Sequence, residues 1–219
     1  MDQPSSPSDT KVEPTRGGVL LAGPPASGKR TVAFALSTLR RSYGHVPALT
    51  AATHPAMGAE QTSQKYLDEL RSWAQLFYEF TVERARYVYD RERLDTLRAQ
   101  GRVPVVCIED IDALSAFERE PDDWLTVILR CPRDHARDRL TRGHSAAGRA
   151  AIITRSWTRR WERSIKALER GTQRFTMTLR SDRLDAVEIA RIVHIAAQAS
   201  ARTNENSPTA EAPSTSRSR

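Results

Sequence analysis

Uninterrupted apolar runs alternate along this chain with stretches whose apolar side chains recur every three or four positions. The apolar runs are short enough to be buried strands, and they occupy residues 19–22, 46–50, 103–108, 125–131 and 175–179. Continuous apolar strands separated by helices are typical of a parallel sheet that is covered on both faces. We therefore predict an α/β fold of three layers, in which ligands bind at the carboxyl ends of the strands.

The intervening stretches have the spacing of amphipathic helices. They cover residues 30–42, 64–89, 91–100, 134–142, 150–170 and 184–199. In the second of them, the stripe that contains Trp73, Leu76 and Phe77 is interpreted as core packing, not as a cofactor site.

The length of 219 residues suits one sizeable domain. Residues 1–15 and 201–219 are rich in Ser, Pro, Thr and charge and have few bulky apolar side chains. Such segments bury too little surface to offset the chain entropy, so we predict two disordered tails. The folded domain is then expected to span residues 16–200.

The formal net charge is +7, and only four of the 34 basic residues are lysine. A basic chain suits anionic partners, and the planar fork of arginine suits phosphate in particular. Alternatively, the arginine excess reflects a genome rich in G and C.

Cys107 and Cys131 lie in or beside apolar runs and are predicted to be buried thiols. No apolar run reaches about 18 residues and no leader pattern is visible, so we predict a cytoplasmic protein without a membrane span.

One short segment carries most of the chemical information. The spacing Gly23-x4-Gly28-Lys29 lies between an apolar strand and a helix, as in a phosphate-binding loop. Backbone N–H groups of such a loop converge on phosphate oxygens, and the positive end of the next helix faces them. The pattern therefore predicts ATP binding, with Lys29 at the terminal phosphates. The expected nucleotide-binding residues are Gly23, Pro24, Pro25, Ala26, Ser27, Gly28, Lys29, Arg30 and Thr31.

The metal-binding residues of such a site are expected in two places, at the start of the helix after the loop and directly after the strand at 103–108. Loops of this kind usually carry Ser or Thr directly after the lysine, whereas here Arg30 takes that position and a hydroxyl follows at Thr31. Glu109 and Asp110 come directly after the strand, where phosphate-loop proteins hold Mg²⁺ through a carboxylate. We predict Thr31 and Asp110 as the metal-binding residues, with Glu109 as the other candidate. Alternatively, the two carboxylates cap the next helix.

Two families share these features. Gly23-Pro24-Pro25 together with residues 108–114 resembles the ring-forming remodelling ATPases. Residues 125–143, which end in Arg139-Leu-Thr-Arg142-Gly, resemble the strand, proline turn and lid helix of guanylate kinases, where the lid helix typically ends in Arg-Leu-x-x-Arg-Gly. Residues 152–155 resemble the second lid helix of the same family. This resemblance spans about residues 17–195, and the loop Gly-Pro-Pro-Ala-Ser-Gly-Lys is similar to that of actinobacterial guanylate-kinase-like proteins.

The resemblance implies a nucleoside monophosphate kinase that transfers phosphate from ATP, with Mg²⁺, to a GMP-like acceptor. It assigns catalysis to Lys29, Arg137, Arg142 and Arg155. It assigns the acceptor pocket to Glu79, Arg84, Arg86, Tyr87 and Glu109.

The chain departs from the family in the acceptor half. Guanylate kinases clamp the phosphate of GMP with a Thr-Thr-Arg-x-x-Arg segment, whereas residues 50–58 here contain no arginine. The sequence therefore leaves open a different acceptor, another phosphorylated or hydroxylated small molecule such as a phosphosugar. Two other hypotheses stay open: a degenerate domain that binds a nucleotide or a partner without transfer, and an ATPase of a larger assembly. In the latter, the basic segment 155–174, with Trp157 and Trp161, would contact nucleic acid.

Overall fold

The computed structural model describes residues 17–53, 58–82, 84–120, 123–142, 155–170 and 176–205. For residues 155, 156 and 200–205 it describes the backbone alone. Most of the two predicted tails and the predicted start of the second lid helix, residues 150–154, lie outside these ranges. Among the described residues, no helix combines the length and the apolar character that crossing a membrane requires.

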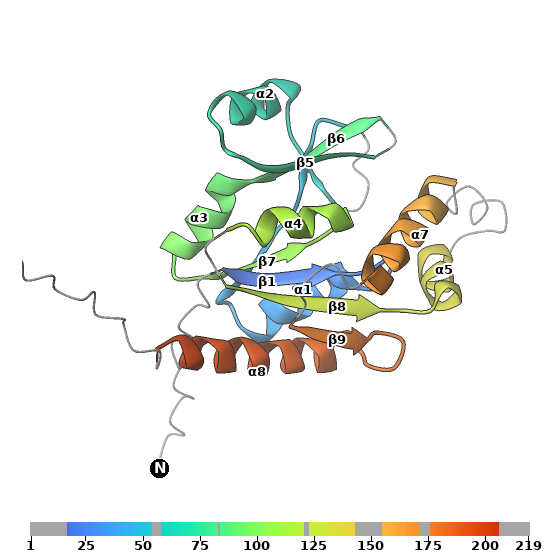
Figure 1. Cartoon of the computed structure of the whole chain (residues 1–219). Helices are drawn as coiled ribbons and strands as arrows, with labels where there is room; N and C mark the ends of the chain where they lie inside the picture. The colour runs from blue at the N-terminus through green and yellow to red at the C-terminus, as the bar shows by residue number, and fades with distance from the viewer. Residues whose placement is uncertain are drawn as a thin grey trace, which may run out of the picture.

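A five-stranded parallel sheet forms the centre of the molecule (Figure 1). In spatial order its strands are β2 (Tyr43–Val46), β7 (Val103–Cys107), β1 (Gly18–Ala22), β8 (Trp124–Arg130) and β9 (Met177–Arg180). The predicted three-layer α/β fold is confirmed. The predicted strand at 46–50 divides into β2 and the separate short strand β3 (Leu49–Thr50), because Pro47 has no N–H group to continue the pairing.

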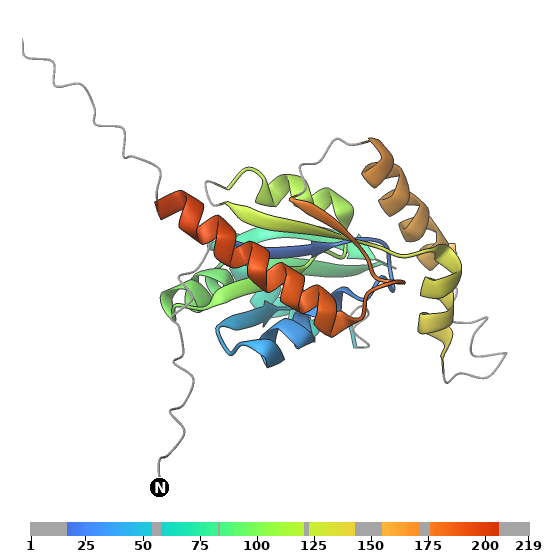
Figure 2. The ribbon, with the colours of Figure 1, turned by 90° about the horizontal axis from the view of Figure 1, so that it is seen from below.

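The two faces of this sheet are both apolar because successive side chains of a strand point to opposite sides. Val19 and Leu21 of β1 pack in the same cluster as residues of α1 (Lys29–Leu39) and α8 (Ala186–Glu205). Leu20 packs on the other face, with residues of α3 (Arg91–Ala99) and α4 (Leu114–Phe117), which follows the single turn η1 (Ile111–Ala113). Figure 2, seen from below, shows α1 and α8 side by side in front of the sheet.

A second, four-stranded sheet lies above the first in Figure 1. Its order is β4 (Glu60–Gln61), β3, β6 (Ala85–Asp90) and β5 (Leu76–Val82). The helix α2 (Gln64–Ser72) covers one face, where Leu67 and Leu70 pack against Leu49 and Val88. This sheet projects from the central domain and was not predicted.

The predicted helix at 64–89 is wrong beyond Ser72. The chain leaves the helix at Trp73 and turns at Ala74, whose φ is 55°. Residues 76–90 are rich in aromatic and β-branched side chains, which favour strands. Apolar residues an even number of positions apart share one face of a strand, so an interval of four fits a strand as well as a helix.

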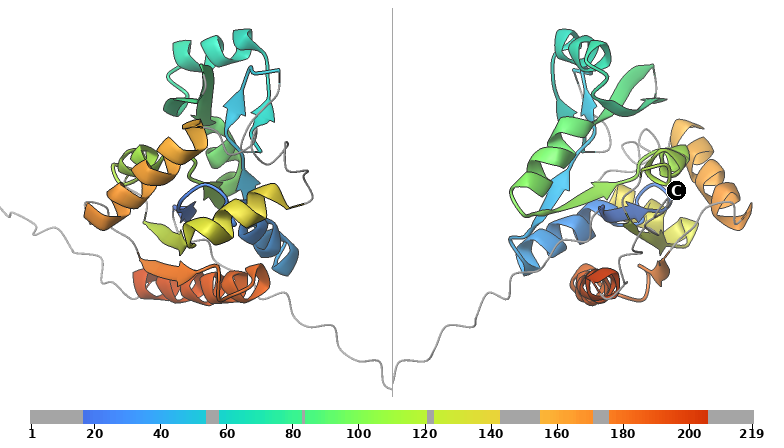
Figure 3. Two further views of the ribbon diagram at one scale, coloured as in Figure 1. Left: turned by 90° about the vertical axis from the view of Figure 1, so that its right-hand side faces the viewer. Right: turned by 60° about the vertical axis from the view of Figure 1, so that its left-hand side comes forward.

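The lid region and the last helix differ from the prediction only in their bounds. The helix α5 runs over Arg133–Thr141, and α7 runs over Arg155–Arg170. Both lie at the end of the sheet toward which the arrows of β1 and β8 point (Figures 1 and 3). The helix α8 continues to Glu205, into the first residues of the segment predicted as a tail.

One buried polar contact joins the central sheet to α8. The hydroxyl of Tyr43 lies 2.9 Å from Nδ1 of His194, and both side chains are buried. Burial raises the pKa of Tyr43 to about 12 and lowers the pKa of His194. The pair is therefore a hydrogen bond between neutral groups.

We expect Tyr43→Phe to lower the free energy of unfolding by about 1–3 kcal/mol, because it leaves a buried nitrogen without its partner. Urea denaturation measures this change. Tyr66→Phe is the matched control, since the Tyr66 hydroxyl makes only a long contact, 3.4 Å, with Asp90. Equal stability of the two variants would contradict the assigned contact.

Candidate functional site

The loop Gly23–Gly28 leaves β1 and turns directly into α1. The backbone N–H of Ser27 donates to the carbonyl of Pro24 (3.1 Å), and that of Val32 donates to Gly28 (3.0 Å), which begins the helix. A side chain at position 23 would collide with the carbonyl oxygen of Leu129, so only glycine fits between the loop and β8. The sheet thus holds the loop close to the carboxyl end of β8.

Lys29 is the first residue of α1, and its ammonium group folds back onto this loop. Its Nζ donates to the carbonyl oxygens of Gly23 (3.1 Å) and Pro24 (3.4 Å). The Oε2 atom of Glu109, directly after β7, lies 3.5 Å from the same nitrogen. The lysine side chain is 5% exposed and the glutamate 12%. Two neighbouring strands therefore place a nearly buried cation and a carboxylate at one point.

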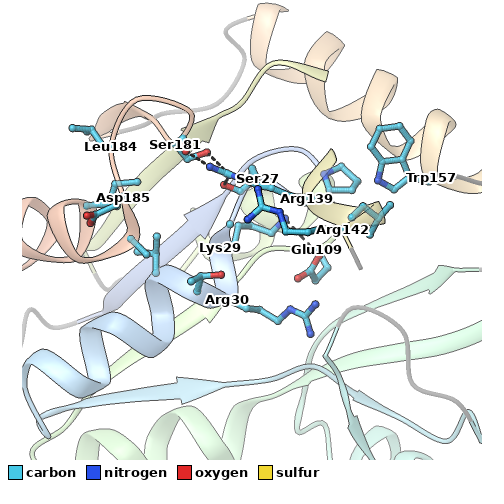
Figure 4. Close-up of a pocket in the computed structure, with 18 of the residues that line it drawn as sticks. Ser27, Lys29, Arg30, Glu109, Arg139, Arg142, Trp157, Ser181, Leu184 and Asp185 are labelled. Atoms are coloured by element: carbon cyan, nitrogen blue, oxygen red, sulfur yellow. Dashed lines mark hydrogen bonds and ion pairs between the residues drawn. The ribbon is translucent and has the colours of Figure 1, made fainter. Parts of the chain in front are cut away.

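A cavity of about 830 Å³ opens above this pair (Figure 4). A volume of this size lies in the range of small-molecule sites, about 300–1,000 Å³. Residues 25–32 of the loop and of α1 form its floor, and residues of α5, α7 and the segment 181–189 form its walls.

Three arginines of the lid helices line this cavity: Arg139, Arg142 and Arg160. Arg139 is the best anchored. Its guanidinium donates to the carbonyl of Ser27 (3.3 Å) and to both Oγ (3.2 Å) and the carbonyl oxygen of Ser181. It therefore joins α5, the loop and the turn after β9.

The predicted lid arginines are only partly found here. Arg142 lines the cavity, whereas Arg137 does not; it is 52% exposed and pairs with Asp134 at 3.2 Å. The side chain of Arg155 lies outside the described residues. Arg139 and Arg160 were missed. The sequence contained part of the information needed to find Arg139. Positions 139 and 142 are three apart and therefore lie on one face of a helix, whereas position 137 lies on a different face.

The tryptophans of α7 are packing residues. Trp157 and Trp161 are 3% and 6% exposed, and their rings stack with centroids 5.6 Å apart. They pack with Cys131 and Ala136, so they attach α7 to the end of β8 and to α5. Trp157 also lines the cavity. A nucleic-acid contact through this segment stays a hypothesis.

Asp110 faces away from the cavity. It accepts a hydrogen bond from the Tyr78 hydroxyl at 3.3 Å, and its other oxygen caps the turn η1. Burial, together with the charge of Asp110, raises the pKa of Tyr78 to about 12. Asp110 does not line the cavity, whereas Thr31 and Glu109 do. Of the two adjacent carboxylates, Glu109 is the one beside Lys29, and Asp110 has the alternative capping role.

The predicted acceptor residues Glu79, Arg86 and Tyr87 lie on two faces of the second sheet, whereas Glu109 follows β7 of the central sheet. Glu79 accepts from Arg71 at 2.6 Å, and Arg86 donates to Asp68 at 2.7 Å, all on the face that α2 covers. Tyr87 is buried on the opposite face, where its ring stacks on Phe80. Arg84 is exposed at the turn between β5 and β6. The alternation of strand side chains separates Glu79 and Arg86 from Tyr87.

A second, small pocket lies beside the main cavity on the side of the second sheet. Its lining consists of Arg30, His45, Pro47, Ala48, Gly58, Ala59, Tyr87, Cys107 and Glu109. Arg30 and Glu109 line both spaces. Burial and the charge of Arg30 lower the pKa of His45, and burial and Glu109 raise the pKa of Cys107 to about 12. The contribution of His45 was missed, since no ligand pattern marks it in the sequence.

The residues at the loop suit a nucleotide with Mg²⁺. In the part of the chain that the structure describes, no three His, Cys, Asp or Glu side chains form a metal-binding group. Mg²⁺ on a nucleotide needs few protein ligands, because phosphates and waters supply the rest. Within the same residues, the buried hydroxyl of Ser27 has no hydrogen-bond partner, which leaves a donor free in the loop.

The architecture is that of a P-loop kinase fold. A guanylate kinase from Anaplasma phagocytophilum has a similar structure, with a TM-score of 0.56 and 15% identity over 90% of this chain and 89% of that one. A sugar kinase from a Janibacter species aligns over 83% of this chain and 96% of its own, with 15% identity and a TM-score of 0.47. No protein-family model and no curated protein sequence matches this chain.

Proposed function

We propose that this protein is an ATP-dependent phosphotransferase that acts on a small phosphorylated acceptor, with a GMP-like nucleoside monophosphate as the expected class. One observation carries the proposal. Arginines of α5 and α7 converge on the same cavity as Lys29 and the loop before α1. A binding site for nucleotide alone needs the loop, whereas a phosphoryl transfer also needs cations around the phosphate that moves.

The triphosphate of ATP would lie along the loop, at the amino terminus of α1. Backbone N–H groups and the helix dipole favour an anion there. Phosphate oxygens would replace the carbonyls that Lys29 now contacts. The Ser27 hydroxyl, which has no partner within the described residues, would donate to the same group.

In the transfer itself, the bond between the γ-phosphorus and the bridging oxygen of the β-phosphate breaks, and ADP leaves. A new bond forms between that phosphorus and an oxygen of the acceptor. If the acceptor oxygen belongs to a phosphate, no proton has to be removed from it. Arg139, Arg142 and Arg160 would stabilise the negative charge that spreads over the equatorial oxygens.

Magnesium would be held by the Thr31 hydroxyl and, through water, by the Glu109 carboxylate, two of the oxygen-bearing side chains that share the cavity with Lys29. When bound, the ion would neutralise the charge of the phosphates. Glu109 has a second task in this arrangement, because it orients the Lys29 ammonium when no phosphate is present.

The test is ADP release from ATP with a panel of acceptors: GMP, dGMP, AMP, CMP, UMP and several phosphosugars. We expect one acceptor to raise release well above the rate without acceptor. The matched control is its dephosphorylated form, for example guanosine beside GMP. If ATP binds in a titration and no acceptor raises ADP release, the transfer proposal fails and the domain binds nucleotide without this reaction.

A further inference from the structure

Arg30 occupies an unusual position for a residue that directly follows the loop lysine. Its side chain leaves the floor of the main cavity and extends toward the second sheet (Figure 4). It lines the small pocket together with His45, Tyr87 and Glu109. Lys29 therefore places its ammonium group on the loop, and Arg30, the next residue, places its side chain beside the small pocket.

The guanidinium of Arg30 has no carboxylate within ion-pair distance among the residues that the structure describes. It is close enough to His45 to disfavour the protonated imidazole, and Glu109 acts on the same ring in the opposite direction. The guanidinium thus faces a space whose one carboxylate already pairs with Lys29. The small pocket itself, about 10 Å³, has room for about one water, so an anion that balances this charge would meet Arg30 where it lines the main cavity with Glu109.

We propose that Arg30 binds the phosphate of the acceptor, with His45 beside it. This inference rests on the proposed phosphotransferase function, whose acceptor side it specifies. The acceptor phosphate has to lie near the γ-phosphate, and the pocket that Arg30 lines shares Glu109 with the donor cavity. The planar fork of arginine binds two phosphate oxygens at once. In this role Arg30 would replace the phosphate-binding arginines that residues 50–58 lack.

Gly58 leaves room for the side chain of Arg30, because it carries no Cβ atom. Its backbone has φ +65°, and a Cβ atom placed there would overlap with the guanidinium of Arg30. Alanine at position 58 would push the end of the arginine aside without removing its charge. Gly58→Ala therefore tests the position of the guanidinium, and Arg30→Ala tests its presence.

The first experiment measures binding, not turnover. The loop is saturated in each variant with a non-hydrolysable ATP analogue and Mg²⁺, and inorganic phosphate, ribose 5-phosphate and GMP are titrated by calorimetry. We expect Arg30→Ala to weaken the binding of the best probe by about ten- to a hundredfold. Arg41→Ala, just beyond the end of α1 and outside both pockets, should bind that probe as the wild type does.

The second experiment compares Gly58→Ala with Gly101→Ala. Gly101 has φ +68° and nothing within 4 Å of the added carbon, so it controls for backbone strain alone. Only Gly58→Ala should weaken phosphate binding. The inference is overturned if the saturated wild type binds none of the three probes, or if Arg30→Ala binds them equally well. Arginine-dependent binding without ADP release would instead refute the transfer alone.

Discussion

Replacing Lys29 with alanine should lower acceptor-dependent ADP release by about 10²–10³-fold, the loss typical of removing one group that stabilises charge in a transition state. The physical reason is the position of its ammonium, 5% exposed and within hydrogen-bond distance of two loop carbonyls. No other described lysine lines the cavity. Lys65→Ala, at an exposed position of α2, is the matched control and should leave the rate unchanged.

Loss of Lys29 also leaves Glu109 without the ammonium that lies 3.5 Å from it. A nearly buried carboxylate without a partner destabilises the fold. The measured activity would then fall because less protein is folded, and not because a catalytic group is missing. The double variant Lys29→Ala with Glu109→Gln removes this charge. We expect it to recover the unfolding midpoint but not the rate. Wild-type activity in Lys29→Ala would show that the loop does not serve phosphoryl transfer.

Arg139→Ala should lower the same rate by about 10²-fold, because it removes a cation at the cavity and the contacts that hold α5 to the loop. Arg139→Lys keeps the charge but cannot reach Ser27 and Ser181 together, so it should recover only part of the rate. Steady-state kinetics of the three proteins, with both substrates varied, measure these changes.

Arg137→Ala is the control within the same helix. Arg137 points to solvent and pairs with Asp134, so its loss should change the unfolding free energy by no more than about 0.5 kcal/mol and leave the rate as it is. If Arg137→Ala were as damaging as Arg139→Ala, the orientation of α5 described above would be wrong. The pair thus tests which of the predicted lid arginines serve the cavity.

Much of the central domain could be predicted from local patterns. The strand, loop and helix around Lys29 are contiguous in the sequence, and the spacing of glycines and lysine between an apolar strand and a helix predicted the loop. The unbroken apolar strands likewise predicted a parallel sheet with two covered faces. The second sheet could not be predicted in this way, because strands with aromatic side chains at even intervals also match a helical spacing.

The chemistry around the loop depends on contacts between distant segments. Local sequence predicted a carboxylate at position 109 or 110, and only the packing of Tyr78 against Asp110 leaves Glu109 beside Lys29. Nothing near Arg30 in the sequence indicates that its side chain meets Gly58. The loop that we propose to bind phosphate is one short segment, and the sequence by itself determined its place between a strand and a helix. The arginines and the carboxylate that line the cavity beside this loop come from strands and helices far apart in the chain, so only the tertiary structure decided them.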